Sequence, residues 1–336
     1  MVRARPERLS SPLAPLLLLT LIGLGCQGVP EPTPPSPVEV PPPRAVRTSG
    51  AMGVAVRMTI AAPPTAETDA AFDAAFTEVR RWERVLSSYD PRGELRQLEE
   101  SWRPGQWSPV SEELGEALAA ALRWSTATAG AFDPTVGALS RLWRDARAQG
   151  SPPDEAALRA ARGAIGLPLL EFDHRQRRVR IRHPNLKLDF GGCGKGFIAD
   201  RALEKLVELG FPAALVDCGG DLAIGAPPPG SRGWIIARVE ADGEETELLL
   251  ADCGLATSGD AEQSLIVDGV RHSHILSPRK REPLQGAPTV TVRAPTAGDA
   301  DAWATAISVD PSWSERLRQR AGFEVWTSNR PDPKKP

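Results

Sequence analysis

The stretch that most constrains the fold of this chain is residues 186–200, with the sequence LKLDFGGCGKGFIAD. Apolar side chains alternate at Leu186, Leu188 and Phe190, as in a short strand; four glycines follow, and then an apolar helical run begins. A junction of this kind directs backbone N–H groups and a helix N-terminus toward one point, which favours a phosphate group, and Lys195 adds a positive charge there. Taken alone, the stretch is equally compatible with a glycine turn packed against a sheet.

Strands and helices alternate along the rest of the chain. The expected elements are a strand at 52–60, helices at 68–86, 111–128 and 300–309, paired strands at 234–239 and 246–250, and a small-residue turn at 256–260. Residues 175–181 are expected to form a hairpin with the strand that starts at Leu186. With 336 residues, of which 41% are hydrophobic, the chain can bury a large core. The sequence therefore predicts an α/β or α+β fold with mixed sheets and packed helices.

The charge balance excludes one class of partner. The chain has 40 basic and 43 acidic residues, so its net charge is −3. A nucleic-acid-binding protein needs a strong basic field, and this chain has none. No nucleic-acid partner is expected.

The N-terminal residues resemble an export signal. Three arginines precede an apolar run at 13–24, which ends in Gly25 and Cys26. Cys26 resembles the lipidation site of bacterial lipoproteins, and the alternative is an ordinary signal without lipid. Residues 1–26 are thus predicted to be a signal peptide with a lipoprotein cysteine, and the proline-rich residues 27–44 a tether. We expect an exported protein of the bacterial cell envelope, anchored through lipid and facing the periplasm.

Three further cysteines lie far apart in the chain. Cys193, Cys218 and Cys253 show no Cys-x-x-Cys spacing, which argues against a zinc site or a redox pair. Either two of them form a disulfide, or all three are small buried residues.

Several single residues are candidates for ligand contacts. Tyr89 is the only tyrosine, and it either stacks on a ligand or lies at a solvent edge. Asp133 precedes a proline and either forms a turn or caps the next helix. Asp301 and Thr305 lie four residues apart, so they share one helix face.

The separated motifs, taken in order, resemble the FAD:protein FMN transferases, formerly called thiamine-biosynthesis lipoproteins. The resemblance extends from Met52 to Val309. Its pieces are Met52-Gly53, residues 87–89, residues 130–136 with Leu142-Trp143, and residues 188–196, 219–221, 257–260, 273–275 and 300–306. Any single piece could arise by chance, whereas the ordered set is specific.

This resemblance implies a function. Members of the family split FAD at its pyrophosphate with Mg²⁺, transfer FMN to a threonine or serine hydroxyl of an exported acceptor such as a respiratory-type flavoprotein, and release AMP. It also implies a T-fold-like flavin-transferase domain in two lobes over residues 45–326, with FAD in the cleft between them, and a polar tail at 327–336. The implied FAD-site residues are Met52, Tyr89, Ala131, Phe132, Asp133, Asp189, Lys195 and Ile275.

The resemblance also implies the metal ligands, namely the carbonyl of Gly192 with Asp301 and Thr305. In phosphoryl transfer, the metal and Lys195 would neutralise charge while the bond to AMP loosens. The acceptor hydroxyl needs a proton acceptor, and His274 is the candidate because its unperturbed pKa lies near neutrality; the alternative is a structural strand histidine. Asp260 is a second candidate base, or a rigid supporting group.

The chain departs from the family pattern after the His274-Ile275 pair. Family members usually have Asp-Pro-x-x-Gly there, whereas this chain has Ser-Pro-Arg-Lys-Arg at 277–281. Ala261 and Gln263 also replace a common tyrosine and an arginine. These changes motivate two alternatives, an FAD pyrophosphatase that yields FMN and AMP, and a non-catalytic FAD-binding envelope lipoprotein.

Overall fold

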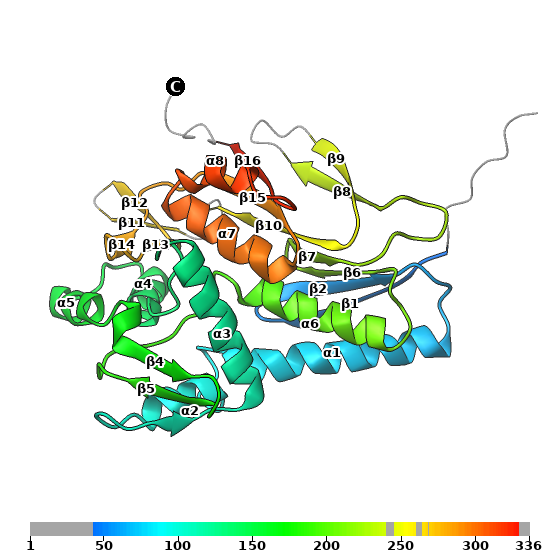
Figure 1. Ribbon diagram of the computed structural model, residues 1–336. Coiled ribbons are helices and arrows are strands. Elements are labelled where there is room, and N and C mark those ends of the chain that lie inside the picture. The colour runs from blue at the N-terminus through cyan, green and yellow to red at the C-terminus, as the bar shows by residue number, and fades with distance from the viewer. Residues whose placement is uncertain (1–42, 240–244, 260–263, 268, 329–336) are drawn as a thin grey trace, which may run out of the picture. The chain divides into compact units, whose positions relative to one another are not determined.

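The computed structural model of the chain describes residues 43–239, 245–259, 264–267 and 269–328, which belong to one compact unit (Figure 1). The predicted signal peptide with Cys26, most of the tether and Asp260 lie outside the described residues. In the part that is described, no helix has both the length and the apolar character needed to cross a bilayer.

The largest sheet of the described residues has seven strands, and each neighbouring pair is antiparallel. In spatial order, the strands are β1 (Ala45–Ala51), β2 (Val54–Ile60), β6 (Ala214–Cys218), β7 (Asp221–Ile224), β10 (Cys253–Ser258), β15 (Thr289–Ala294) and β16 (Glu324–Ser328). The sheet and the helices packed on it confirm the predicted mixed fold.

Three long helices, α1 (Ala66–Leu86), α6 (Gly194–Glu208) and α7 (Ala297–Val309), lie side by side over one face of this sheet (Figure 1). Apolar side chains recur along α1 at helical spacing and are buried there, Phe72, Phe76 and Val79 among them. α7 is rich in alanine and buried on almost all sides, and its Asp301 and Ser308 side chains are buried with it. On β7 and β10, a further apolar cluster receives Trp234 of the hairpin β8 (Trp234–Val239) and β9 (Glu245–Leu250).

A smaller layer lies beside the sheet (Figure 1). It contains α2 (Glu94–Glu100), β3 (Ser108–Pro109), α3 (Glu112–Ala127), α4 (Gly137–Gln149), α5 (Glu155–Gly163), a 3₁₀ turn (Leu167–Leu169), β4 (Leu170–Asp173) and β5 (Arg178–Ile181). Leu114 of α3 and Leu188 belong to the same buried cluster as the residues of the main sheet. The two lobes expected from the resemblance therefore share one continuous core.

Short hairpins complete the described fold. They are β11 (Ser264–Val267) with β12 (Val270–Ser273), and β13 (Leu276–Ser277) with β14 (Glu282–Pro283). The helix α8 (Trp313–Arg318) precedes the last strand.

Most predicted elements are present, with shifted ends. The strand expected from Met52 begins at Val54, because Met52 and Gly53 form the hairpin turn with φ of 53° and 74°. The first long helix begins earlier than expected, since Thr65 is its N-cap and Thr68 closes a capping box. The helices at 111–128 and 300–309 and the paired strands at 234–239 and 246–250 are confirmed within a few residues.

Three local predictions were wrong. Residues 186–190 form no strand and have only an isolated bridge between Lys187 and Val136. β5 pairs with β3 and β4 instead of with that segment. The expected turn at 256–260 is strand β10 as far as Ser258, because the backbone from Ala256 to Ser258 pairs with β15.

Candidate active site

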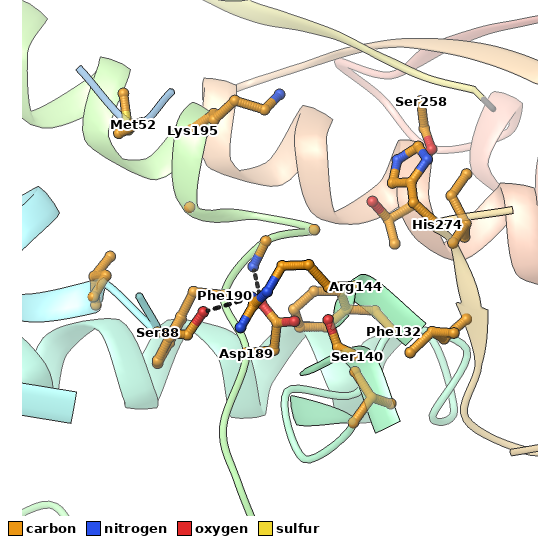
Figure 2. A pocket seen from close by; sticks show the side chains of 18 of the residues that line it. Met52, Ser88, Phe132, Ser140, Arg144, Asp189, Phe190, Lys195, Ser258 and His274 are labelled. Atoms are coloured by element: carbon orange, nitrogen blue, oxygen red, sulfur yellow. Dashed lines mark hydrogen bonds between the residues drawn. The ribbon is translucent and has the colours of Figure 1, made fainter. Parts of the chain in front are cut away.

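The described residues surround a pocket of about 630 Å³ (Figure 2). Its walls come from the β1–β2 turn, the end of α1, the loop before α4, α4 itself, the glycine loop, the end of β10, residues 274–278 and α7. A cavity of this size is in the usual range for small-molecule sites.

All eight residues that the resemblance assigns to FAD line this one pocket: Met52, Tyr89, Ala131, Phe132, Asp133, Asp189, Lys195 and Ile275. Gly192, Thr305 and His274 line it as well. The fold thus brings together segments that are up to 253 positions apart, from Met52 to Thr305.

The β1–β2 turn is held over the pocket by a side chain that sequence reasoning missed. Met52 has a left-handed backbone conformation, and its N–H donates to Oε1 of Glu83 on α1 at an N···O distance of 2.6 Å. Glu83 lies one helical turn before the end of α1, and only the packing of the hairpin on that helix brings the two together. The Glu83 carboxylate therefore orients the Met52 side of the site.

The loop before α4 and the glycine loop support each other. Asp133 accepts hydrogen bonds from the backbone N–H and the hydroxyl of Thr135, at 2.8 and 2.6 Å, and so forms the predicted turn. It does not cap α4, whose N-cap is Val136. Burial raises the pKa of Asp133, although the two hydrogen bonds from Thr135 act to lower it. The N–H of Asp189 donates to Pro134 O at 2.8 Å, which links the two loops.

The glycine loop turns at once into α6. Asp189 Oδ1 accepts the N–H of Gly191 at 2.7 Å, and the N–H of Gly194 donates to Phe190 O at 2.6 Å. α6 begins at Gly194, earlier than the sequence indicated. The helix N-terminus and Lys195 therefore border the pocket, as a phosphate site requires.

Lys195 belongs to a buried charge cluster with two carboxylates. It forms an ion pair with Asp221 at the start of β7, which is 1% exposed. Asp301 on α7 is 6% exposed, and its Oδ2 accepts the N–H of Gly196 at 3.1 Å. Burial by itself lowers the pKa of Lys195, but the charges of Asp301 and Asp221 outweigh burial and raise it. Asp221 was not among the predicted site residues, although its Gly-Gly-Asp motif was noted.

Two buried carboxylates face one ammonium group. Burial raises the pKa of Asp301, against the effect of Lys195. Burial and the charge of Asp301 likewise raise the pKa of Asp221. With both carboxylates ionised, the cluster carries one uncompensated negative charge, which is costly inside a protein. A further cation beside Asp301 would remove this cost.

Gly192 and Thr305 adjoin this cluster closely. A Cβ added to Gly192 would lie 3.1 Å from Oγ1 and 2.9 Å from Cγ2 of Thr305. Thr305 is one helical turn after Asp301, so the Asp301 carboxylate and the Thr305 hydroxyl lie on the same side of α7, next to the glycine loop. Among the described residues, no three His, Cys, Asp or Glu side chains form a metal cluster. One carboxylate, one hydroxyl and one carbonyl nevertheless fit a small hard cation that keeps water and substrate phosphate as its other ligands.

His274 and Ser258, at the end of β10, both line the pocket (Figure 2). The backbone of His274 is fixed by neighbours, since the Ser273 hydroxyl accepts the N–H of Ile275 at 3.1 Å. The other candidate base, Asp260, lies outside the described residues. The base role of either residue stays a prediction.

The altered loop at 277–281 keeps a well-formed turn. The Ser277 hydroxyl accepts the N–H of Lys280 at 3.2 Å, and Arg281 has a φ of 57°, a left-handed conformation that glycine adopts readily. Arg279 donates to Asp310 and to the carbonyl of Ala129, both at 3.0 Å. The loop is therefore tied to the segment that carries Ala131 and Phe132.

The three described cysteines are buried and free. This confirms the interpretation of small buried residues, and burial raises the pKa of each thiol. None of them lines the pocket.

Comparisons with known proteins agree on one family. The sequence pattern of the ApbE family matches residues 52–326. The chain is 29% identical over 322 residues to the FAD:protein FMN transferase of Escherichia coli (strain K12), covering 93% of this chain and 90% of that protein. It is 31% identical to the FAD:protein FMN transferase of Treponema pallidum (strain Nichols), covering 73% of each.

A solved structure shows the same fold. The crystal structure of the ApbE protein from Thermotoga maritima matches with a TM-score of 0.73 at 28% identity, covering 84% of this chain and 94% of that one.

Proposed function

The chain belongs to the ApbE family, and from this we propose that it is a Mg²⁺-dependent FAD:protein FMN transferase that attaches FMN through a phosphoester to a threonine or serine hydroxyl and releases AMP. The observation that carries the proposal is the pocket itself, which is lined by all eight expected FAD residues. One of them, Lys195, connects the pocket to the buried carboxylates Asp221 and Asp301 behind it.

The residues of the chain have separate tasks in this reaction. Asp301, Thr305 and the carbonyl of Gly192 would hold Mg²⁺, which neutralises charge on the diphosphate when it is bound. Lys195, aligned by its ion pair with Asp221, places a fixed positive charge at the start of α6. Positioning and charge neutralisation are most of what phosphoryl transfer needs from a protein.

The bond changes are those of a single displacement. The acceptor hydroxyl oxygen forms a bond to the phosphorus of the FMN half, and the P–O bond to AMP breaks, so that AMP leaves with the electron pair. The hydroxyl proton passes to a base, for which His274 is our candidate because it lines the pocket and its unperturbed pKa lies near neutrality. Proton transfer to a positioned base typically contributes about 10²–10⁴-fold in rate.

The cellular setting is also part of the proposal. The export signal and Cys26 support a lipid-anchored protein in the bacterial envelope that faces the periplasm and acts on an exported acceptor. The proline-rich tether would hold the folded unit away from the membrane.

The test is Asp301→Ala in the purified chain, with FAD, Mg²⁺ and a candidate acceptor. We expect wild type to release AMP and to add an FMN-sized mass to the acceptor, and the variant to be slower by about 100-fold or more, because several kcal/mol of charge stabilisation are lost. Chromatography follows AMP and FMN, and mass spectrometry follows the acceptor.

The control is Asp145→Ala, which removes an exposed carboxylate from α4 and should behave as wild type. Free FMN released at a rate that the acceptor does not change would replace transfer by FAD hydrolysis. FAD that stays whole with wild type, Mg²⁺ and acceptor would favour the non-catalytic binding protein.

A further inference from the structure

Helix α4 has one face in the core and another in the pocket. Leu139, Trp143 and Ala146 are buried in an apolar cluster. Ser140, Arg144 and Arg147 follow at helical spacing on another face, and all three line the pocket. Figure 2 shows Ser140 and Arg144 in its wall. Neither arginine is among the residues that the resemblance assigned to FAD.

Arg144 is held in place without being neutralised. Its guanidinium carbon lies 4.0 Å from the ring centroid of Tyr89, which is 73% exposed. Its Nη1 donates to the Ser88 hydroxyl at 3.5 Å. Both partners are uncharged, so the positive charge remains available at the edge of the pocket.

Arg147 contains a buried donor that lacks a partner. Its Nη1 atom is buried and makes no hydrogen bond in the structure. Burial and the nearby Arg144 lower the pKa of the Arg147 guanidinium, whereas Tyr89 acts in the opposite direction. A buried unsatisfied donor on a charged group is costly, and like charges three positions apart on a helix repel each other.

No carboxylate among the described residues forms an ion pair with Arg144 or Arg147. Arg141 on the same helix, by contrast, pairs with buried Glu99 at 2.8 Å. The carboxylates that line the pocket are engaged elsewhere: Glu83 with Met52, Asp133 with Thr135, and Asp189 with Gly191. The positive charges of Arg144 and Arg147 therefore have no carboxylate partner among the described residues, and an anion from outside the chain would neutralise them.

We propose that Arg144 and Arg147 form an anion subsite of the pocket that binds a phosphate group of FAD. This inference rests on the proposed function, because FAD supplies the anion. Guanidinium groups match phosphate oxygens with several donors in a fixed geometry, which a lysine cannot reproduce. The phosphate belongs to either the FMN half or the AMP half of the dinucleotide, and the two can be tested separately.

The experiment measures binding to the full-length chain without divalent metal ions, so that FAD stays whole. The probes are FAD, FMN, AMP, riboflavin and adenosine, and the variants are Arg147→Gln, Arg144→Gln and Arg147→Lys. Arg159→Gln on α5 is the control, since it removes the same charge from an exposed side chain that lies outside the pocket.

We expect Arg147→Gln to weaken FAD binding about tenfold, the loss of one charge-assisted hydrogen bond. Binding of FMN or of AMP should weaken similarly, which identifies the half that carries the phosphate, while riboflavin and adenosine bind unchanged. Arg147→Lys should fall between wild type and Arg147→Gln. With Mg²⁺ and acceptor, the KM for FAD should rise while kcat stays within about twofold, as for a lost uniform binding contact.

Equal FAD binding by wild type, Arg147→Gln and Arg144→Gln would overturn this inference and leave the proposed function intact. A raised KM for the acceptor with unchanged FAD affinity would also overturn it, because the pair would then face the acceptor. Wild type that binds no FAD would overturn the proposed function and this inference together. Arg147→Gln should melt no lower than wild type, since Nη1 makes no bond that the variant could lose.

Discussion

Gly192 is the residue whose missing side chain most directly shapes the site. A methyl group there would lie 2.9 Å from Cγ2 and 3.1 Å from Oγ1 of Thr305. Its φ is not positive, so alanine is allowed by the backbone and only the contact with Thr305 opposes it. The glycine is thus required for the close approach of the loop to α7.

Gly192→Ala should therefore displace the Thr305 hydroxyl without unfolding the protein. We expect the turnover rate to fall about 10- to 100-fold, because small misplacements at a reacting centre have large effects on rate. The Mg²⁺ concentration that gives half-maximal activity should rise. Steady-state assays at several Mg²⁺ concentrations measure both quantities.

Gly115→Ala on α3 is the matched control, since its added methyl would meet Cζ of Phe172 at an ordinary 3.6 Å and Gly115 does not line the pocket. Adding Thr305→Ser to Gly192→Ala removes the Cγ2 contact and should restore part of the activity. Full activity of Gly192→Ala alone would contradict the role of this contact.

At the scale of elements, α6 and α7 are locked together by close contacts and by a cap. A Cβ at Gly196 of α6 would lie 2.2 Å from Ala297 O, so the helices meet backbone to backbone. Both carboxylate oxygens of Asp200 accept N–H groups at the start of α7, from Ala297 and Gly298, each at 2.8 Å. This pairing sets the position of Asp301 relative to Lys195.

The Asp200 cap predicts a pH dependence of stability. Burial raises the pKa of Asp200 to about 7, against the two backbone hydrogen bonds. The folded state then binds a proton more tightly than the unfolded chain, in which the pKa is about 4. This stabilisation is complete below about pH 4 and is lost as the pH rises through about 7.

Asp200→Asn, which mimics the protonated form, should match wild type near pH 4 and be more stable at pH 8. The expected gain is on the order of 1 to 4 kcal/mol, and urea unfolding at the two pH values measures it. A variant less stable than wild type at pH 8 would mean that the ionised cap outweighs burial.

At the scale of the molecule, the pocket joins the main sheet to the smaller layer. Met52 and Lys195 come from the first, and Arg144 from the second. A ligand that contacts both parts binds only when both are folded, so it stabilises the whole unit.

FAD without divalent metal ions should therefore shift the entire unfolding transition. At 100 times its Kd, we expect a stabilisation of about 2.7 kcal/mol. The nine tryptophans report unfolding by fluorescence, and circular dichroism reports helix content. If FAD moved only one of two separate transitions, the ligand would contact a single part and the shared pocket would be wrong.

Much of the secondary structure, and some of the residues that share a helix face, could be predicted from neighbouring residues in the sequence. The sequence predicted the helix at 111–128, for which the structure shows Ser111 as the N-cap. The spacing of Asp301 and Thr305 likewise placed both on one face of α7. These features depend on neighbours within one or two turns, which the sequence displays directly. The ordered motifs indicated the family, and the family match agrees.

Only the tertiary structure decided which distant groups meet. The hydrogen bond from Gly196 to Asp301 spans 105 positions. Asp221 reaches Lys195 because α6 packs against β7. Residues 186–190 show the alternating apolar pattern of a strand. Their only strand-like pairing is an isolated bridge between Lys187 and Val136, so they belong to no sheet in the described part of the chain. The sequence likewise could not predict that Arg144 and Arg147 lack ion-pair partners. Whether a charged side chain is paired depends on which residues pack against its helix, not on the sequence of the helix itself.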